Sequence, residues 1–194
     1  MDIEIRRLTP DLAEEYVRFF DVTPHNDEFG HKCYCVSWRS DDSYTDDCGH
    51  WFPTQEERRE KALQFVKDSS IQGYLAYCDG RVLGWCNANE NSRVCLAIQT
   101  YWKWPVEEYP AGVKVKSIFC FVIAPEMQRK GVATKLLERV CQDAAAEGFD
   151  YVEAYTTIKF AHDGFQGPFA LYQKCGFSKH AKKKDKIVMR RALK

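Results

Sequence analysis

The residues between Ile118 and Gly148 are typical of a strand, a glycine-bearing turn and a helix in direct succession. The uninterrupted apolar run from Ile118 to Ile123 has the length and content of a buried strand. Pro125 ends this strand, because proline has no N–H for a sheet ladder. Beyond the turn, Gly148 supplies a helix stop, and the apolar residues that precede it recur at helix spacing: Val132, Leu136, Leu137, Val140 and Ala144. The other elements must be arranged around this unit.

The turn in this unit, residues 128–133, suits a phosphate group. The first N–H groups of a helix lack partners within the helix, and the aligned peptide dipoles add partial positive charge there. Gly131 and Ala133 are small enough to let an anion approach, and Arg129 and Lys130 add charge. The sequence is neither a Walker loop, because its lysine precedes the glycine, nor a dinucleotide G-x-G-x-x-G motif. The alternative is a strand–helix turn that binds nothing.

Two motifs together resemble the GNAT family of N-acetyltransferases. Gln128-x-x-Gly131-x-Ala133 resembles the pyrophosphate loop of that family, and the segment 170–177 resembles its helix followed by Gly-Phe, which carries an acid tyrosine, here Tyr172. The resemblance implies an α/β (α+β) fold in which a mixed, mostly antiparallel sheet is flanked by helices. It also implies one N-acetyltransferase domain over residues 1–194, with acetyl-coenzyme A as cosubstrate.

The resemblance also implies roles for particular residues. The sheet would open beside the central strand, where the backbone of Phe121, Val122 and Ile123 would pair with the pantetheine arm. The pyrophosphate would be held by Gln128, Arg129, Lys130, Gly131, Val132 and Ala133. Tyr172 would protonate the departing thiolate, since a phenol can donate to a thiolate of comparable basicity. The alternatives are an ordinary core strand and a tyrosine that only packs its ring.

The sequence does not identify a single residue as the general base. The central strand carries no acid, so the nearest candidate is Glu153, on the next predicted strand, Tyr151–Thr157. An ion-paired carboxylate is the alternative interpretation of Glu153. His162 and Asp163 are further candidates in a connecting loop.

A group of cysteines and histidines near the N-terminus has ligand types that zinc accepts. It comprises His31, Cys33, Cys35, Cys48 and His50. Structural zinc sites favour C-x₂₋₄-C pairs, whereas C-x-C in a strand would put its thiols on opposite faces. We therefore predict packing cysteines and no metal. A metal-binding interaction module is the alternative, which elemental analysis would test.

The remaining pattern predicts a strand near Ile5, a helix after Thr9, and a helix from Thr54 to about Ser70 that begins with a capping box. Asp79-Gly80 indicates a β-hairpin between residues 73–78 and 81–87. A closing hairpin follows residue 177.

The composition favours a reduced, cytoplasmic protein, and the family resemblance implies an enzyme with a small-molecule or peptide amine as acceptor. Lys+Arg and Asp+Glu number 28 each, so no net charge attracts nucleic acid or a membrane surface. The nine cysteines are an odd number, and the first residues lack a secretory pattern. A non-catalytic acyl-coenzyme A binding or sensing domain is the alternative function, and thiol release with a panel of amines separates the two. The acceptor and the oligomeric state stay open.

Overall fold

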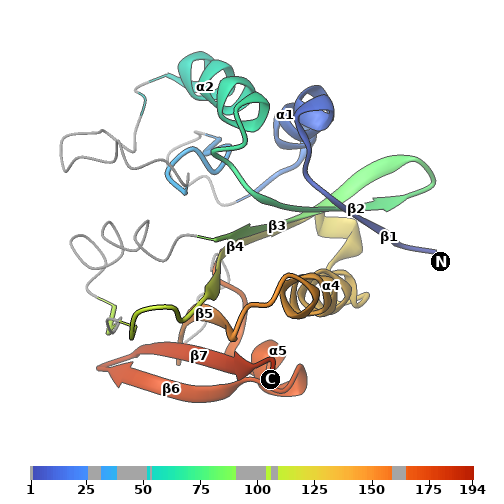
Figure 1. Ribbon diagram of the computed structural model, residues 1–194. Helices are drawn as coiled ribbons and strands as arrows, with labels where there is room; N and C mark the ends of the chain where they lie inside the picture. Colours follow the sequence, from blue (N-terminus) through green and yellow to red (C-terminus); the bar gives the residue numbers. More distant parts are fainter. Residues whose placement is uncertain are drawn as a thin grey trace.

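The computed structural model describes residues 2–25, 32–38, 52, 54–90, 104–105, 109–158 and 165–194. Within these residues the chain forms a seven-stranded sheet with helices on both faces (Figure 1). The strands are β1 (Glu4–Arg7), β2 (Gly73–Cys78), β3 (Arg81–Asn89), β4 (Val115–Ile123), β5 (Tyr151–Thr157), β6 (Ser178–Lys183) and β7 (Lys186–Ala192). The helices are α1 (Ala13–Val22), α2 (Gln55–Lys67), α4 (Val132–Ala146) and α5 (Phe169–Lys174), with short 3₁₀ turns η1 (Pro10–Leu12) and η4 (Pro125–Met127).

The sheet has the order β1-β2-β3-β4-β5-β7-β6. Only the central pair, β4 and β5, is parallel, and all other neighbouring pairs are antiparallel. The expectation of a mixed, mostly antiparallel sheet is confirmed.

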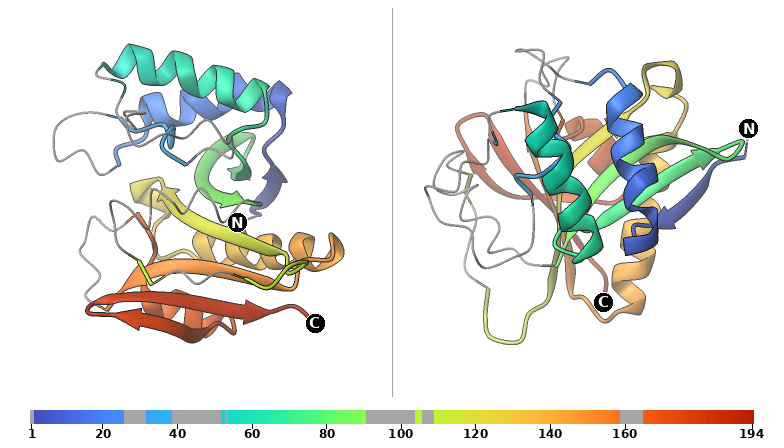
Figure 2. Two further views of the ribbon diagram at one scale, coloured as in Figure 1. Left: turned by 60° about the vertical axis from the view of Figure 1, so that its left-hand side comes forward. Right: turned by 90° about the horizontal axis from the view of Figure 1, so that it is seen from above.

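Helices α1 and α2 cover one face of the sheet, and α4 and α5 cover the other (Figure 2). Each face has its own core. Trp85 and Phe119 pack toward α1 and α2, and Ile118 packs with Leu136 of α4 on the opposite side. The helices on the two faces therefore belong to separate cores, and the central strands of the sheet are buried on both sides.

Two local predictions are confirmed. Thr54 and Glu57 form the capping box of α2: the Thr54 hydroxyl accepts from the Glu57 N–H at 3.1 Å, and the Glu57 carboxylate accepts from the Thr54 N–H at 3.0 Å. The β2–β3 hairpin turns through Asp79 and Gly80, whose φ values are 50° and 72°, as a type I′ turn requires. The end of α2 differs from the prediction. The helix stops at Lys67, because the chain enters the left-handed region at Ser69 with φ 63°.

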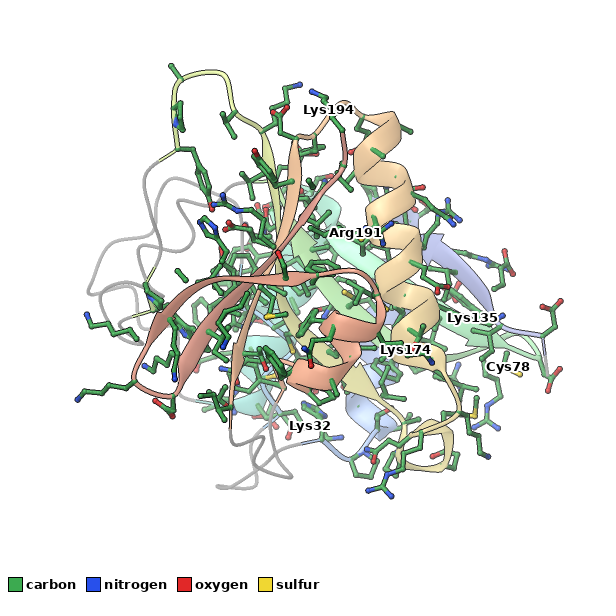
Figure 3. The ribbon with its side chains drawn as sticks, turned by 90° about the horizontal axis from the view of Figure 1, so that it is seen from below. Lys32, Cys78, Lys135, Lys174, Arg191 and Lys194 are labelled. Carbon is green, nitrogen blue, oxygen red and sulfur yellow. The ribbon has the colours of Figure 1, made fainter. Side chains whose placement is uncertain are left out.

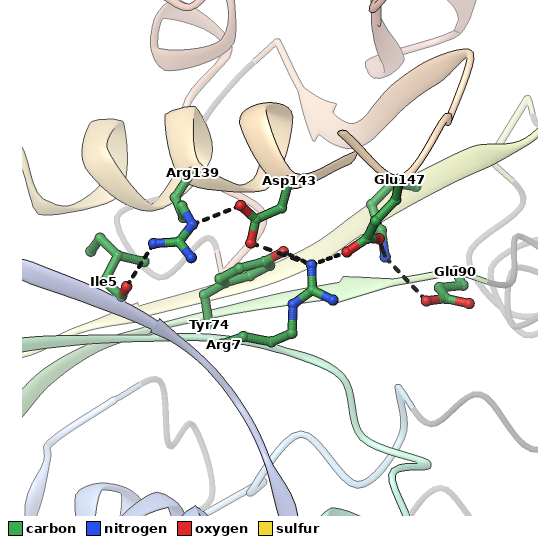
Figure 4. A network of polar contacts seen from close by, with 8 residues as sticks. Ile5, Arg7, Tyr74, Glu90, Arg139, Asp143 and Glu147 are labelled. Carbon is green, nitrogen blue, oxygen red and sulfur yellow. Dashed lines mark hydrogen bonds and ion pairs between the residues drawn. The ribbon is translucent and has the colours of Figure 1, made fainter. Parts of the chain in front are cut away.

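Charged side chains fix the C-terminal half of α4 against β1 (Figure 4). Arg139 donates to Asp143 at 2.8 Å and to the backbone oxygen of Ile5 at 3.1 Å. Arg7 of β1 donates to Asp143 at 3.3 Å and also to Glu147. These contacts hold the C-terminal half of α4 beside β1, and the N-terminus of α4 follows the end of β4 through η4.

None of the helices in the described part of the chain combines the length and the apolar character that crossing a bilayer requires.

Candidate active site

A β-bulge in β4 distorts the middle of the sheet. Asn87 of β3 pairs with Cys120, but the next residue, Ala88, pairs with Ile118, so Phe119 has no partner in β3. A bulge adds one residue to a strand and breaks the alternation of its side chains. Phe119 and Cys120 consequently both pack toward α1 and α2. The strand also turns away from its next neighbour at this point.

The bulge coincides with a gap between β4 and β5. The two strands pair only from Val115↔Tyr151 to Ile118↔Ala154, although each continues beyond the last pair. In this gap the N–H of Phe121 points away from β3. Because successive backbone groups of a strand face opposite sides, Ile123 faces the gap as well. Val122 lies between them and its backbone faces β3, where it pairs with Trp85.

The N-terminus of α4 lies beyond the end of this open edge. Gly131 is its N-cap with φ 85°, and its carbonyl accepts from the N–H of Lys135 at 3.0 Å. No side chain caps the helix and its first turn has no acidic residue. A Cβ placed on Gly131 would meet no atom of the described residues within 4 Å, so these residues leave the space above the turn open. Gln128, Arg129 and Lys130 are exposed beside it, and the turn thus fits an anionic group such as a pyrophosphate.

Tyr172 enters the gap from α5. Its side chain is fully buried against Phe121 and Phe177, with ring centroids 6.5 and 5.5 Å away. Its hydroxyl donates to the backbone oxygen of Gln166. Burial raises the pKa of Tyr172 well above its usual value, and the nearby thiols add to this shift. The phenol therefore keeps its proton throughout the neutral range. Figure 3 shows the face of the sheet that α4 and α5 cover, where Lys135 and Lys174 project from these helices.

The segment 165–167, just before α5, lies in the gap. The Phe121 N–H donates to the carbonyl of Phe165 at 2.6 Å, and the Thr156 hydroxyl donates to the carbonyl of Gly167 at 2.7 Å. Together with the Tyr172–Gln166 bond, three consecutive carbonyls are bound by groups that line the gap. The Phe121 N–H and the Tyr172 hydroxyl therefore bind the carbonyls of two adjacent residues.

Glu153 of β5 is only 1% exposed and has several partners. One carboxylate oxygen accepts from Arg190 at 2.6 Å, and the other accepts from the hydroxyl of Tyr109. The Tyr155 hydroxyl lies 3.5 Å from that second oxygen. These contacts are those of a buried ion pair, and they put Glu153 on the face that carries Tyr155 and α1.

A polar pair on β3 was not predicted. Asn87 and Asn89 are fully buried, and both side-chain amides donate to the backbone oxygen of Trp38, at 3.3 and 3.1 Å. Neither side-chain oxygen has a hydrogen-bond partner within the part of the chain that the structure describes. The Trp38 ring stacks on Phe119 at 5.2 Å, and Phe119 stacks on Tyr155 at 5.4 Å. The sequence signal was the pair of asparagines two apart in an apolar strand, which puts both on one face.

The cysteines near the N-terminus differ from the prediction in their geometry. Cys33 and Cys35 lie in a turn rather than a strand, since Tyr34 and Cys35 have φ values of 48° and 51°. The two thiols consequently interact, and this contact together with burial raises the pKa of Cys33. Among the residues the structure describes, no three Cys, His, Asp or Glu side chains are grouped to hold a metal ion. His31, Cys48, His50, His162 and Asp163 lie outside the described residues.

The chain is similar in sequence to one protein family. The sequence model described as "Acetyltransferase (GNAT) family" matches residues 34–177. No curated protein sequence matches the chain.

Solved structures with the same fold include three acetyltransferases. One is a GNAT acetyltransferase from Streptococcus pneumoniae, with 19% identity, TM-score 0.54, and coverage of 98% of this chain and 99% of that one. Another is the PaiA N-acetyltransferase of Thermoplasma acidophilum in complex with coenzyme A, with 16% identity, TM-score 0.56 and coverage of 99% of both chains. The third is a polyamine N-acetyltransferase of Drosophila melanogaster that forms N-acetylagmatine, with 12% identity, TM-score 0.56, and coverage of 98% of this chain and all of that one.

Proposed function

Because the chain belongs to the GNAT family of acetyltransferases, we propose that it transfers an acetyl group from acetyl-coenzyme A to a primary amine. The amine would attack directly, within a ternary complex. The observation that carries this proposal is that two donors of the gap, the Phe121 N–H and the Tyr172 hydroxyl, bond to the carbonyls of consecutive residues. Transfer from a thioester requires a donor for the carbonyl oxygen and an acid for the leaving sulfur, which a main-chain N–H and a phenol can supply.

The donors have different tasks in this proposal. Acetyl-coenzyme A would supply the acetyl group as a thioester. The Phe121 N–H would bind the carbonyl oxygen where negative charge develops, which is the contribution of an oxyanion-hole donor. Tyr172 would give its proton to the sulfur that leaves, and its raised pKa ensures that the proton is present.

The binding of the cosubstrate would extend from the gap to α4. The backbone of Ile123 continues the open edge beyond Phe121, and the contact that Val122 could add is limited because its backbone pairs with β3. Residues 128–133 would hold the pyrophosphate with the free amides of the helix start and the charges of Arg129 and Lys130.

The acceptor would approach from the face of α1 and α2, because α4 and α5 border the other side of the gap. There the side-chain oxygens of Asn87 and Asn89 lack donors among the described residues, and an amine supplies N–H groups. Amide oxygens are neutral, so they would not raise the pKa of the amine as a carboxylate would. Glu153 remains the candidate base, alongside its role as the partner of Arg190.

We also propose that residues 1–194 act as a single domain in the reducing cytoplasm. One sheet contains every described strand, and the seven described cysteines are free.

Thiol release tests the proposed function. The purified protein is incubated with acetyl-coenzyme A and a panel of primary amines that includes agmatine, polyamines and peptide amines, with matched alcohols as controls. We expect release that depends on one class of amine. Release with an alcohol and with no amine would contradict the amine acceptor.

A further inference from the structure

The segment 165–167, named the strap from here on, occupies the groups that the proposed reaction needs. Its first carbonyl, from Phe165, accepts from the Phe121 N–H at 2.6 Å. Its second, from Gln166, accepts from the Tyr172 hydroxyl. The third, from Gly167, accepts from the Thr156 hydroxyl at 2.7 Å.

The first two contacts exclude a bound thioester. A backbone N–H has one hydrogen to donate, and at 2.6 Å it is used by Phe165. The Tyr172 hydroxyl likewise has one proton, which points to Gln166. In the described conformation neither donor is available for a thioester carbonyl or for a leaving sulfur.

We infer that the strap is an internal mimic of the thioester, which acetyl-coenzyme A must displace, and that Thr156 is the positioning residue that holds it. This inference rests on the proposed function. The strap supplies a carbonyl where the thioester carbonyl would lie, so the buried donors of the gap remain satisfied when no cosubstrate is bound. The closed and open strap form an equilibrium, and the apparent affinity for acetyl-coenzyme A is reduced by the fraction of closed molecules.

Gly167 shows how closely the strap fits. Its φ is +76°, and a Cβ on it would lie 3.2 Å from the Tyr172 hydroxyl and 3.3 Å from the ring of Phe121. Both contacts exist only while the strap is closed. Any side chain at this position would therefore disfavour the closed state.

The affinity for acetyl-coenzyme A, measured by calorimetry, tests the inference with Thr156→Val. Valine has nearly the shape of threonine but cannot donate to Gly167, so the closed strap loses one hydrogen bond. We expect the Kd to fall about five-fold, the factor that one ordinary hydrogen bond contributes. Thr156→Ser, which keeps the hydroxyl, should restore the wild-type Kd. If Thr156 only stabilised the fold, the Kd of Thr156→Val would be unchanged or higher than that of wild type. Either result would overturn the inference.

A second pair of variants acts on the strap itself. Gly167→Ala should lower the Kd as Thr156→Val does. Gly148→Ala is the matched control, because Gly148 also has φ +76° but has nothing within 4 Å of an added Cβ. It should lose stability without any change in Kd. Equal Kd values for wild type, Gly167→Ala and Gly148→Ala would show that the strap does not compete with the cosubstrate.

Hydrogen exchange at the Phe121 amide distinguishes failure of the strap from failure of the proposed function. The amide should exchange faster in Thr156→Val than in wild type without cosubstrate, and equally slowly in both with acetyl-coenzyme A. A wild-type protein that binds no acetyl-coenzyme A would contradict the proposed function. Binding with no difference between the variants would contradict the strap alone.

Discussion

Tyr172 combines a packed ring with a hydroxyl that one substitution can remove. The ring contacts Phe121 and Phe177, and these contacts need no oxygen. The hydroxyl has one partner among the described residues, the carbonyl of Gln166. Stability and proton donation can therefore be measured separately at this residue.

We expect Tyr172→Phe to leave the affinity for acetyl-coenzyme A within a few-fold of wild type and to lower the single-turnover rate about 10²–10⁴-fold. The effect belongs mainly to kcat, because the proton is needed only as the thiolate departs. Rapid-quench measurements with a saturating amine provide the test. An unchanged rate would make Tyr172 a packing residue.

The raised pKa of Tyr172 also predicts a pH profile. Burial raises this pKa well above 10, so the phenol holds its proton below that pH. The rate should rise with pH as the amine loses its proton and should not fall on approach to pH 10. Turnover between pH 6 and 10 measures this profile. A decline between pH 8 and 9.5 in a folded enzyme would mean that another group supplies the proton.

Glu153→Gln separates a base from an ion-pair partner. Loss of the carboxylate leaves Arg190, 18% exposed, without its partner at 2.6 Å. We expect the free energy of unfolding to fall by about 2 to 4 kcal/mol, as for a broken buried pair. Asp150→Asn is the control, since the Asp150–Lys194 pair is screened by solvent and its loss should cost clearly less. Urea unfolding gives both values, and intact stability with a lost kcat would instead identify Glu153 as the base.

At the scale of elements, α4 has a different task at each end. Its N-terminus is uncapped and open, whereas its C-terminal half is tied to β1 through Arg7, Arg139 and Asp143. Both ends can be tested by single substitutions.

At the N-terminus, Gly131→Val should raise the Kd for acetyl-coenzyme A at least about ten-fold, because a branched side chain would occupy the open space above the amides. Gly148→Val is the control at the other end. It places the same side chain at a similar positive φ and should cost similar stability with an unchanged Kd. Wild-type affinity in folded Gly131→Val would show that the phosphates bind elsewhere.

At the C-terminal end, stability should depend on pH through Asp143. Burial raises the pKa of this carboxyl, but the hydrogen bond from Arg139 and the charges of Arg139 and Arg7 outweigh it and hold the pKa below 3.8. A lowered pKa contributes stability above the unfolded-state value, and this contribution is lost as pH falls through the folded-state value. Asp143→Asn should thus be less stable than wild type at pH 6, by less than about 1 kcal/mol after solvent screening. Chemical unfolding should show the difference shrink as pH falls below 3.8 and vanish once pH is below the folded-state pKa, and a constant difference would exclude this linkage.

The elements that the sequence predicted are those whose signals are local. The capping box at Thr54 and the turn at Asp79-Gly80 depend on neighbours within three residues, and both are confirmed. The bulge at Phe119 was not predicted, because it arises from the register with β3. The turn at Cys33 and Cys35 was not predicted, because the spacing of two cysteines does not reveal a positive φ.

At the scale of the whole molecule, the sheet consists of two parts that meet at four paired positions. Strands β1 to β4 form one part and β5 to β7 the other, and their shared register is Val115–Ile118 with Tyr151–Ala154. The sequence predicted both strands, and the family resemblance implied an opening beside the central strand, but the residue at which pairing ends, Ile118, depends on packing between distant segments. The same holds for the strap and for the two asparagines, whose partners lie far away in the chain.

A ligand in the gap should therefore stabilise the whole fold. Acetyl-coenzyme A at a hundred times its Kd should add about 2.7 kcal/mol to the free energy of unfolding. Thermal unfolding should show a clear increase in Tm with acetyl-coenzyme A and none with NAD or ATP. The absence of an increase at millimolar acetyl-coenzyme A would contradict the proposed cosubstrate.

The bulge in β4 depends on the number of residues in that strand rather than on their identity. Because one unmatched residue, Phe119, separates the two registers of β3 with β4, substitutions at this position keep the number of residues and should keep the gap. Deletion of a single residue there would restore even alternation and let β4 pair with β5 along its full length. Such a chain would gain hydrogen bonds between β4 and β5 and would lose the opening between them. Its sheet would be more regular, and it would lose catalysis. A change in the number of residues at this position would therefore alter the opening itself, whereas a replacement such as Tyr172→Phe acts on a group within it.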